Sequence, residues 1–151
     1  MAKLVALDTN LLILLVVGLT DTKYIASHKR LREYTTSDFY ILQKFIVESK
    51  GVIVTPNVLT EASNLLRQTQ EPAKSRISRR FKELISKLQE KYIPSAQASS
   101  RDEFIRLGLS DAALLQIEQD DIVLLSTDLD LYLAALAAGK DAINFNHHRE
   151  L

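Results

Sequence analysis

Two aspartates stand just beyond apolar runs that are typical of buried strands. Asp8 follows the run at residues 3–7, and Asp128 follows the run at residues 122–125. In an open parallel sheet, ligands bind outside the carboxyl ends of the strands, near the point where the strand order reverses. We therefore expect both carboxylates at one edge of the sheet, where clustered acids need either raised pKa values or bound cations.

Two further acids are expected to reach the same edge. Glu61 lies in the helix that should follow a strand at residues 52–55, and Asp111 opens a helix that should run back from that edge. Oxygen ligands, in a chain without cysteine and with no histidine in these motifs, suit Mg²⁺ or Mn²⁺. The sequence therefore predicts a divalent metal site formed by Asp8, Glu61, Asp111 and Asp128.

Each acid also has a purely structural explanation. Asp8 could cap the first helix, and Asp111 would interact favourably with the dipole of its own helix. Glu61 could be a solvated helix residue, while Asp128 and Asp130 could close a turn. What favours the metal site is the spacing of all four acids relative to the expected strands, which places them at one edge of the sheet.

Strand and helix signals alternate along the whole chain, which predicts an α/β fold with helices packed on a mostly parallel sheet. Strands are expected at residues 3–7, 52–55, 122–125 and 142–145, and helices at 11–18, 37–49, from 56 onward, 77–88, 111–119 and 130–138. A polar stretch at residues 20–36 has no clear periodicity. No linker divides the 151 residues, so we expect one domain over residues 1–151.

The charge balance is neutral overall but uneven along the chain. Nineteen basic and nineteen acidic side chains cancel, yet residues 67–91 carry eight Lys or Arg against three Glu. A basic helix between residues 74 and 91 could hold an RNA backbone, and a solvated or dimer-facing helix explains the same pattern equally well. The candidate RNA-binding side chains on it are Arg76, Arg79, Arg80 and Lys82.

Composition excludes several classes of site. The chain has no cysteine, so disulfides, thiolate metal sites and cysteine nucleophiles are ruled out, and a reducing compartment is expected. The apolar run at residues 11–19 is shorter than the ~20 residues needed to cross a bilayer, and it should form a buried helix. We therefore expect a cytoplasmic protein that does not bind membranes.

Three tyrosines are weaker candidates for ligand contacts. Tyr24, Tyr34 and Tyr40 fall in or beside the polar stretch and could stack on bases, although packing explains them better. His28, in the same stretch, gives no indication of a ligand site.

Four segments around the acids occur in a recognisable order. They are V-A-L-D-T-N-L-L at residues 5–12, T-P-N-V-L-T-E-A-S-N-L-L around Glu61, G-L-S-D-A-A-L-L around Asp111 and V-L-L-S-T-D-L-D-L around Asp128. Together they resemble the PIN-domain family, over almost the whole chain to N-F-N at residues 144–146. The polar stretch at residues 20–36 departs from that family's pattern.

The resemblance implies a Rossmann-like three-layer fold with five parallel strands and a metal-dependent endoribonuclease. The acidic positions of the family are matched by Asp8, Glu61, Asp111 and Asp128. Ser126 falls where the family often has threonine, and its hydroxyl is expected to orient a water or a neighbouring carboxylate. Asp130 and Asn10 are expected to be auxiliary residues of this site.

By analogy with that family, the chain would be the toxin of a prokaryotic toxin–antitoxin pair that hydrolyses RNA phosphodiesters. Its expected partners are RNA, an antitoxin protein and a second copy of the chain. One rival is a PIN-like RNA-binding or scaffolding module in RNA maturation with little activity. Another is a phosphatase or phospho-acceptor domain with Asp8 as nucleophile, although it lacks a second aspartate two residues later.

Overall fold

A five-stranded, fully parallel sheet forms the centre of the computed structural model, which describes residues 2–149. The strands are β1 (Leu4–Leu7), β2 (Gly51–Val54), β3 (Gln89–Glu90), β4 (Ile122–Ser126) and β5 (Asp141–Asn144). They lie in the order β3-β2-β1-β4-β5. This arrangement confirms the predicted α/β class with a Rossmann-like, five-stranded parallel sheet flanked by helices.

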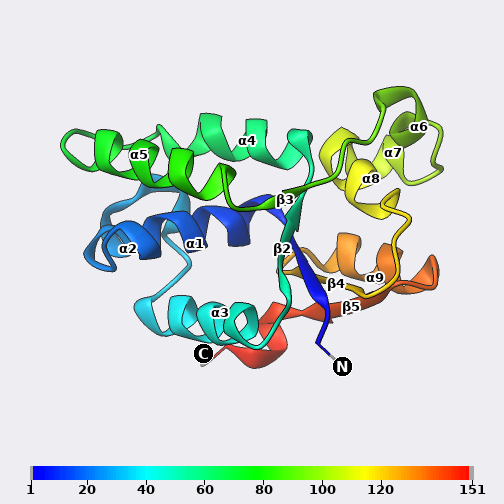
Figure 1. Cartoon of the computed structure of the whole chain (residues 1–151), viewed down its shortest axis with the longest axis horizontal. Coiled ribbons are helices and arrows are strands. Elements are labelled where there is room, and N and C mark those ends of the chain that lie inside the picture. The colour runs from blue at the N-terminus through cyan, green and yellow to red at the C-terminus, as the bar shows by residue number, and fades with distance from the viewer. Residues whose placement is uncertain (1, 150–151) are drawn as a thin grey trace.

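Helices cover the sheet on both sides. They are α1 (Thr9–Thr20), α2 (Lys23–Ser27), α3 (Thr36–Val47), α4 (Pro56–Leu66), α5 (Ala73–Ile85), α6 (Ser95–Ser99), α7 (Phe104–Leu107), α8 (Leu109–Leu115) and α9 (Leu129–Ala137), with short 3-10 helices η1 (Lys29–Leu31) and η2 (Phe145–His148). In Figure 1, α1 to α5 lie to one side of the strands and α6 to α9 to the other. Among the helices within residues 2–149, none is both long enough and apolar enough to cross a bilayer.

The strand order reverses between β1 and β4. From β1 the chain continues to β2 and β3 on one side, then crosses to β4 and β5 on the other. β1 and β4 pair in register, with Leu7 opposite Leu125, and the backbone N–H of Asp8 donates to the Leu125 carbonyl at 3.3 Å. The carboxyl ends of these two strands are thus adjacent at the place where such sheets bind ligands.

Helix α1 leaves β1 at Asp8 and runs through the core. All of its residues from Leu11 to Gly18 are buried, so the helix is enclosed on every side. Gly18 permits the contact with α3, since a Cβ atom there would lie 2.1 Å from the ring of Phe39. The apolar run at residues 11–19, expected to form a buried helix, is therefore part of a central core helix.

The polar stretch at residues 20–36 is ordered by long-range contacts. It contains α2 and η1, and His28 between them is buried. The backbone N–H of Arg30 donates to His28 Nδ1 at 3.1 Å, so Nε2 carries the proton and donates to the Leu66 carbonyl at 3.1 Å. His28 is thus a structural residue that attaches this stretch to the end of α4, which its sequence context did not indicate.

Besides α2, η1 and η2, three elements were not predicted. Strand β3 is only two residues long and both are exposed, so it has no apolar pattern to reveal it. Helices α6 and α7, of five and four residues, are too short to show helical periodicity. Helix α8 also ends at Leu115, four residues earlier than expected.

Candidate active site

A hollow of about 380 Å³ lies beyond the carboxyl ends of β1 and β4. It is lined by all four acids that the sequence singles out, together with Asn10, Ser110 and neighbouring residues of the α7–α8 segment. Asp8 and Asp128 reach it from strand ends, Glu61 from α4 and Asp111 from the first turn of α8. The fold therefore brings together four carboxylates separated by as many as 120 positions in the chain.

Asp8 forms the buried floor of this acidic hollow. One carboxylate oxygen, Oδ1, accepts a hydrogen bond of 2.9 Å from the backbone N–H of Leu11, so Asp8 caps α1. The other, Oδ2, accepts from Ser126 Oγ at 2.6 Å and from the Thr127 backbone N–H at 2.9 Å. Asp8 is therefore a helix cap, as the structural explanation proposed, and also a lining residue of the acidic hollow.

Opposing effects act on the pKa of Asp8. Burial raises it, and the charge of Asp128 adds to the rise, while the three hydrogen bonds from Ser126, Leu11 and Thr127 favour the ionised form. The net direction is upward. Ser126 itself is fully buried at the end of β4, and its Oγ accepts from the Asp128 backbone N–H at 2.9 Å. Ser126 thus connects the two strand ends through one hydroxyl and orients Asp8.

Glu61 and Asp128 form the exposed rim. Glu61 Oε2 accepts a hydrogen bond of 3.2 Å from Ser110 Oγ, which joins α4 to α8. Asp128 Oδ1 caps α9 by accepting from the Leu131 backbone N–H at 3.2 Å. The second oxygen of each of these two carboxylates accepts no hydrogen bond from residues 2–149.

Asp111 has a strongly raised pKa in the acidic hollow. It is half-buried, and no donor within residues 2–149 hydrogen bonds to its carboxylate. Burial, followed by the charges of Asp128, Asp8 and Glu61, raises its pKa from 3.8 to about 7. A carboxyl with so high a pKa indicates that a proton or a cation is needed to offset the surrounding negative charge.

The residues fit a divalent cation in charge and in donor type. The lining acids supply only oxygen donors, the kind that Mg²⁺ and Mn²⁺ prefer. Within residues 2–149, however, no three or more His, Asp or Glu side chains are already arranged to hold a metal ion together. The fit therefore rests on the charge of the hollow and on the raised pKa of Asp111.

Of the two auxiliary candidates, Asn10 lines the acidic hollow and Asp130 does not. Asn10 is exposed and lines the acidic hollow. Asp130 lies in the first turn of α9, is exposed, and is not among the lining residues. Asn10 is therefore positioned to contact a ligand, whereas Asp130 can influence the hollow only through its negative charge.

The basic side chains of α5 lie outside the acidic hollow. The guanidinium of Arg76 lies 5.4 Å from the centre of the Tyr24 ring and donates to its hydroxyl at 2.7 Å, so both residues are engaged in packing. Arg80 pairs with Glu83 at 3.4 Å on the helix surface. Arg79 and Lys82 are exposed. A role for α5 in RNA binding stays a prediction.

Near the acidic hollow, Tyr34 was expected only as a packing residue or a base-stacking side chain, and Thr127, Asn146 and Arg149 were not predicted as functional residues. Tyr34 is buried, and its hydroxyl lies 3.0 Å from Thr127 Oγ1. Asn146 Nδ2 donates to the Thr127 carbonyl at 3.1 Å, and Asn146 Oδ1 accepts from the Arg149 guanidinium at 3.1 Å. Thr127 and Asn146 fall in the quoted segments around Asp128 and at residues 144–146, whereas Arg149 falls in no quoted segment and had no sequence signal.

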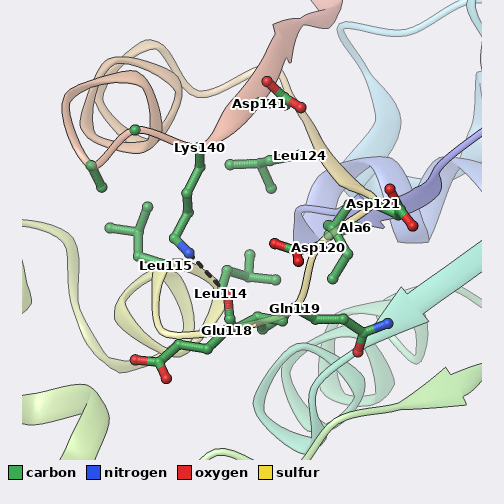
Figure 2. A pocket seen from close by; sticks show the side chains of 14 residues that line it. Ala6, Leu114, Leu115, Glu118, Gln119, Asp120, Asp121, Leu124, Lys140 and Asp141 are labelled. Atoms are coloured by element: carbon green, nitrogen blue, oxygen red, sulfur yellow. Dashed lines mark hydrogen bonds between the residues drawn. The ribbon is translucent and has the colours of Figure 1, made fainter.

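Another hollow, of about 480 Å³, opens at the opposite edge of the sheet. Figure 2 shows Lys140 reaching across it, where Nζ donates to the Ile117 carbonyl at 2.9 Å. Asp121 and Asp141, at the starts of β4 and β5, also line it. Because ligands of parallel sheets bind at the carboxyl ends of the strands, we assign the candidate site to the acidic hollow instead.

No protein-family model, curated protein or solved structure shows significant similarity to the chain. The resemblance to PIN domains therefore stays a prediction from the quoted motifs. The functional argument below depends on the geometry and the electrostatics of the acidic hollow.

Proposed function

We propose that this chain is a divalent-metal-dependent endoribonuclease. The observation that carries the proposal is the meeting of Asp8, Glu61, Asp111 and Asp128 in one hollow, with the pKa of Asp111 raised to about 7. Such a concentration of carboxylates repels a polyanion unless a cation offsets it. The choice of RNA as substrate comes from the sequence resemblance to PIN domains.

The rim and floor acids have different tasks in this proposal. Asp111, Asp128 and Glu61 would hold Mg²⁺ or Mn²⁺ through carboxylate oxygens, and Asp8 would add negative charge from the floor of the acidic hollow. When bound, the cation polarises the scissile phosphodiester and makes water a better nucleophile. Ser126 and the Thr127 N–H keep the Asp8 carboxylate in one orientation, and Asn10 is available to contact substrate beside Asp128.

Two rival functions make different use of the same residues. A phospho-acceptor needs a free, exposed carboxylate oxygen, but Asp8 is 5% exposed and both of its oxygens accept hydrogen bonds. A non-catalytic RNA-binding scaffold has no need for four acids in one hollow, because their mutual repulsion destabilises the fold. Both considerations favour the nuclease.

The biological setting that we propose is the toxin half of a prokaryotic toxin–antitoxin pair acting in the cytoplasm. An antitoxin protein and a second copy of the chain are the proposed partners. This part of the proposal follows from the PIN-domain resemblance alone.

The test is an RNA cleavage assay with purified protein in Mg²⁺, in Mn²⁺ and in EDTA. We expect internal cleavage of RNA in either metal and none in EDTA. Asp111→Asn should reduce the rate by ~10² to 10³, because the substitution removes one negative ligand while preserving the size of the side chain.

Asp102→Asn is the matched control, since Asp102 is exposed and does not line the acidic hollow. It should cleave at the wild-type rate. Circular dichroism should give the same spectrum for both variants. Wild-type cleavage by well-folded Asp111→Asn, or undiminished cleavage in EDTA, would refute the proposal.

A further inference from the structure

A third hollow, of about 490 Å³, adjoins the acidic one and has a different charge. It is formed largely by the polar stretch at residues 20–36 and by the segment after β5. Its polar and charged lining includes Lys29, Arg30, Arg32, Tyr34, Asn146 and Arg149. We call it the basic hollow.

Three of its cations are available to a ligand. Lys29, Arg30 and Arg32 are exposed, and within residues 2–149 no acidic side chain forms an ion pair with any of them. Exposed cations of this kind bind phosphate oxygens at little desolvation cost. The basic hollow therefore presents three uncommitted positive charges, against the carboxylates of Glu33 and Asp128 in its lining.

The fourth cation, Arg149, is already engaged. Its guanidinium makes two hydrogen bonds of 3.1 Å to the Asp38 carboxylate and one of 3.1 Å to Asn146, and a further one to the Glu33 carbonyl. It also lies over the Tyr34 ring, 4.8 Å from its centre. Arg149 forms a wall of the basic hollow, and its charge is offset by Asp38.

The basic and acidic hollows share a boundary. Asn10 and Asp128 line both of them, so a ligand that leaves the acidic hollow past these residues enters the basic one. Thr127 lines the basic hollow while its backbone N–H donates to Asp8, the floor of the acidic hollow. The two hollows thus form one continuous surface in which carboxylates give way to cations.

Long-range contacts hold the basic hollow in place. His28, directly before Lys29, is buried and hydrogen bonded to the Leu66 carbonyl and to the Arg30 N–H. Tyr34, at the other end of the segment, is hydrogen bonded to Thr127. The segment that carries the three cations is thus attached at both ends, so their backbone positions are set before any ligand arrives.

From this arrangement we infer that the basic hollow binds the sugar-phosphate backbone of the RNA strand immediately to one side of the bond that is cut. The inference rests on the proposed function for its choice of RNA. A strand whose scissile phosphate occupies the acidic hollow must carry its neighbouring phosphates across the boundary at Asn10 and Asp128. Those phosphates then lie beside Lys29, Arg30 and Arg32, where charge is complementary.

The experiment measures binding separately from cleavage. A fluorescently labelled single-stranded RNA of about 12 nucleotides is titrated with protein in EDTA, and anisotropy is followed over a range of salt concentrations. The variant Lys29→Gln, Arg30→Gln, Arg32→Gln removes the three charges and retains long polar side chains. Each phosphate contact with a single strand contributes ~0.7 to the slope of log affinity against log salt, so the slope should fall by about 1.4 to 2.

The matched control is Lys23→Gln, Lys44→Gln, Lys50→Gln, which removes three exposed cations that line neither hollow and lie outside the basic helix at residues 74–91. Its salt slope should stay within experimental error of the wild-type slope. Thermal denaturation should confirm that both variants fold. If the basic-hollow variant does not fold, Arg32→Gln alone carries the test, with an expected fall of ~0.7.

Equal slopes for wild type and the basic-hollow variant would overturn the inference, even if the wild-type protein cleaves RNA. An equal fall of the salt slope in the basic-hollow variant and in the control would also overturn the inference, because only the total charge of the protein would then matter. No binding by wild type at low salt would do the same, and an acidic protein would become the better occupant. A selective loss of slope without cleavage in Mg²⁺ or Mn²⁺ would uphold the basic hollow and refute only the nuclease proposal.

Discussion

Ser126 Oγ donates a 2.6 Å hydrogen bond to Asp8 Oδ2, and this bond joins the carboxyl ends of β4 and β1 beneath the acidic hollow. Ser126→Ala removes the donor and leaves a buried carboxylate with one partner fewer. We expect the free energy of unfolding to fall by about 1 to 3 kcal/mol, the cost of leaving a buried charged group underbonded. Urea denaturation measures the change.

Ser37→Ala is the control for that substitution, since Ser37 is exposed near the start of α3 and the helix cap is Thr35. Its effect should stay within ~0.5 kcal/mol. A similar loss in both variants would mean that the Ser126 hydroxyl has no special role.

The raised pKa of Asp111 predicts that stability depends on pH. In the unfolded chain the carboxyl titrates near 3.8, and in the folded, metal-free protein near 7. Between these values the folded protein binds more protons, so this group's contribution to stability is lost as pH rises from about 4 to about 7. Asp111→Asn should therefore be the more stable protein at about pH 8 in EDTA, by on the order of 1 to 2 kcal/mol after solvent screening.

Thermal unfolding of wild type and Asp111→Asn from about pH 4 to about pH 8 checks this. The difference between the two proteins should shrink toward the acidic end, where the wild-type carboxyl is neutral. The exposed Asp102→Asn variant should show no comparable gain at any pH. Lower stability of Asp111→Asn at about pH 8 would contradict the electrostatic argument.

Divalent metal should stabilise the folded chain. Folding brings the four acids to one hollow, whereas the unfolded chain separates them, so Mg²⁺ or Mn²⁺ binds the folded state more tightly. At a metal concentration 100 times the dissociation constant, the gain should be about 2.7 kcal/mol. Differential scanning calorimetry of wild type and Asp111→Asn measures it, and an identical rise in Tm for both would place the metal elsewhere.

The cleavage defects of the acids should not add. Asp111→Asn, Asp128→Asn and the double variant should have rates of similar magnitude, because carboxylates that share a cation act as one unit and losing one disables the group. Single-turnover RNA cleavage gives the three rates. A double variant slowed by the product of the two single effects would indicate independent roles.

Much of the framework was predictable because its signals are local. Strands β1, β2 and β4 are apolar runs that the sheet buries, and the acids after β1 and β4 follow from the parallel arrangement. The convergence of Glu61 and Asp111 was also predictable, because their helices must connect to neighbouring strands. Short exposed elements such as β3 carry no such signal.

The basic hollow could not be predicted, because contacts between distant parts of the chain create it. His28 bonds to Leu66, 38 positions away, and Tyr34 bonds to Thr127, 93 positions away. Without these contacts, Lys29 and Arg32 belong only to a polar stretch without periodicity. The double role of Asp8 was similarly hidden, since its bonds to Ser126 and Thr127 require β4 to lie beside β1.

The enclosure of α1 has a consequence for how the site moves. A helix buried on all sides exchanges its amide hydrogens only through large-scale opening, so we expect α1 to be the slowest-exchanging segment. Asp8 caps this helix and therefore lies at one end of that segment. Glu61 and Asp128 are exposed, and exposed side chains change rotamer on far shorter timescales. The site thus combines a nearly fixed floor at Asp8 with mobile side chains at the rim. The rim can adapt to an incoming ligand while the floor keeps its geometry.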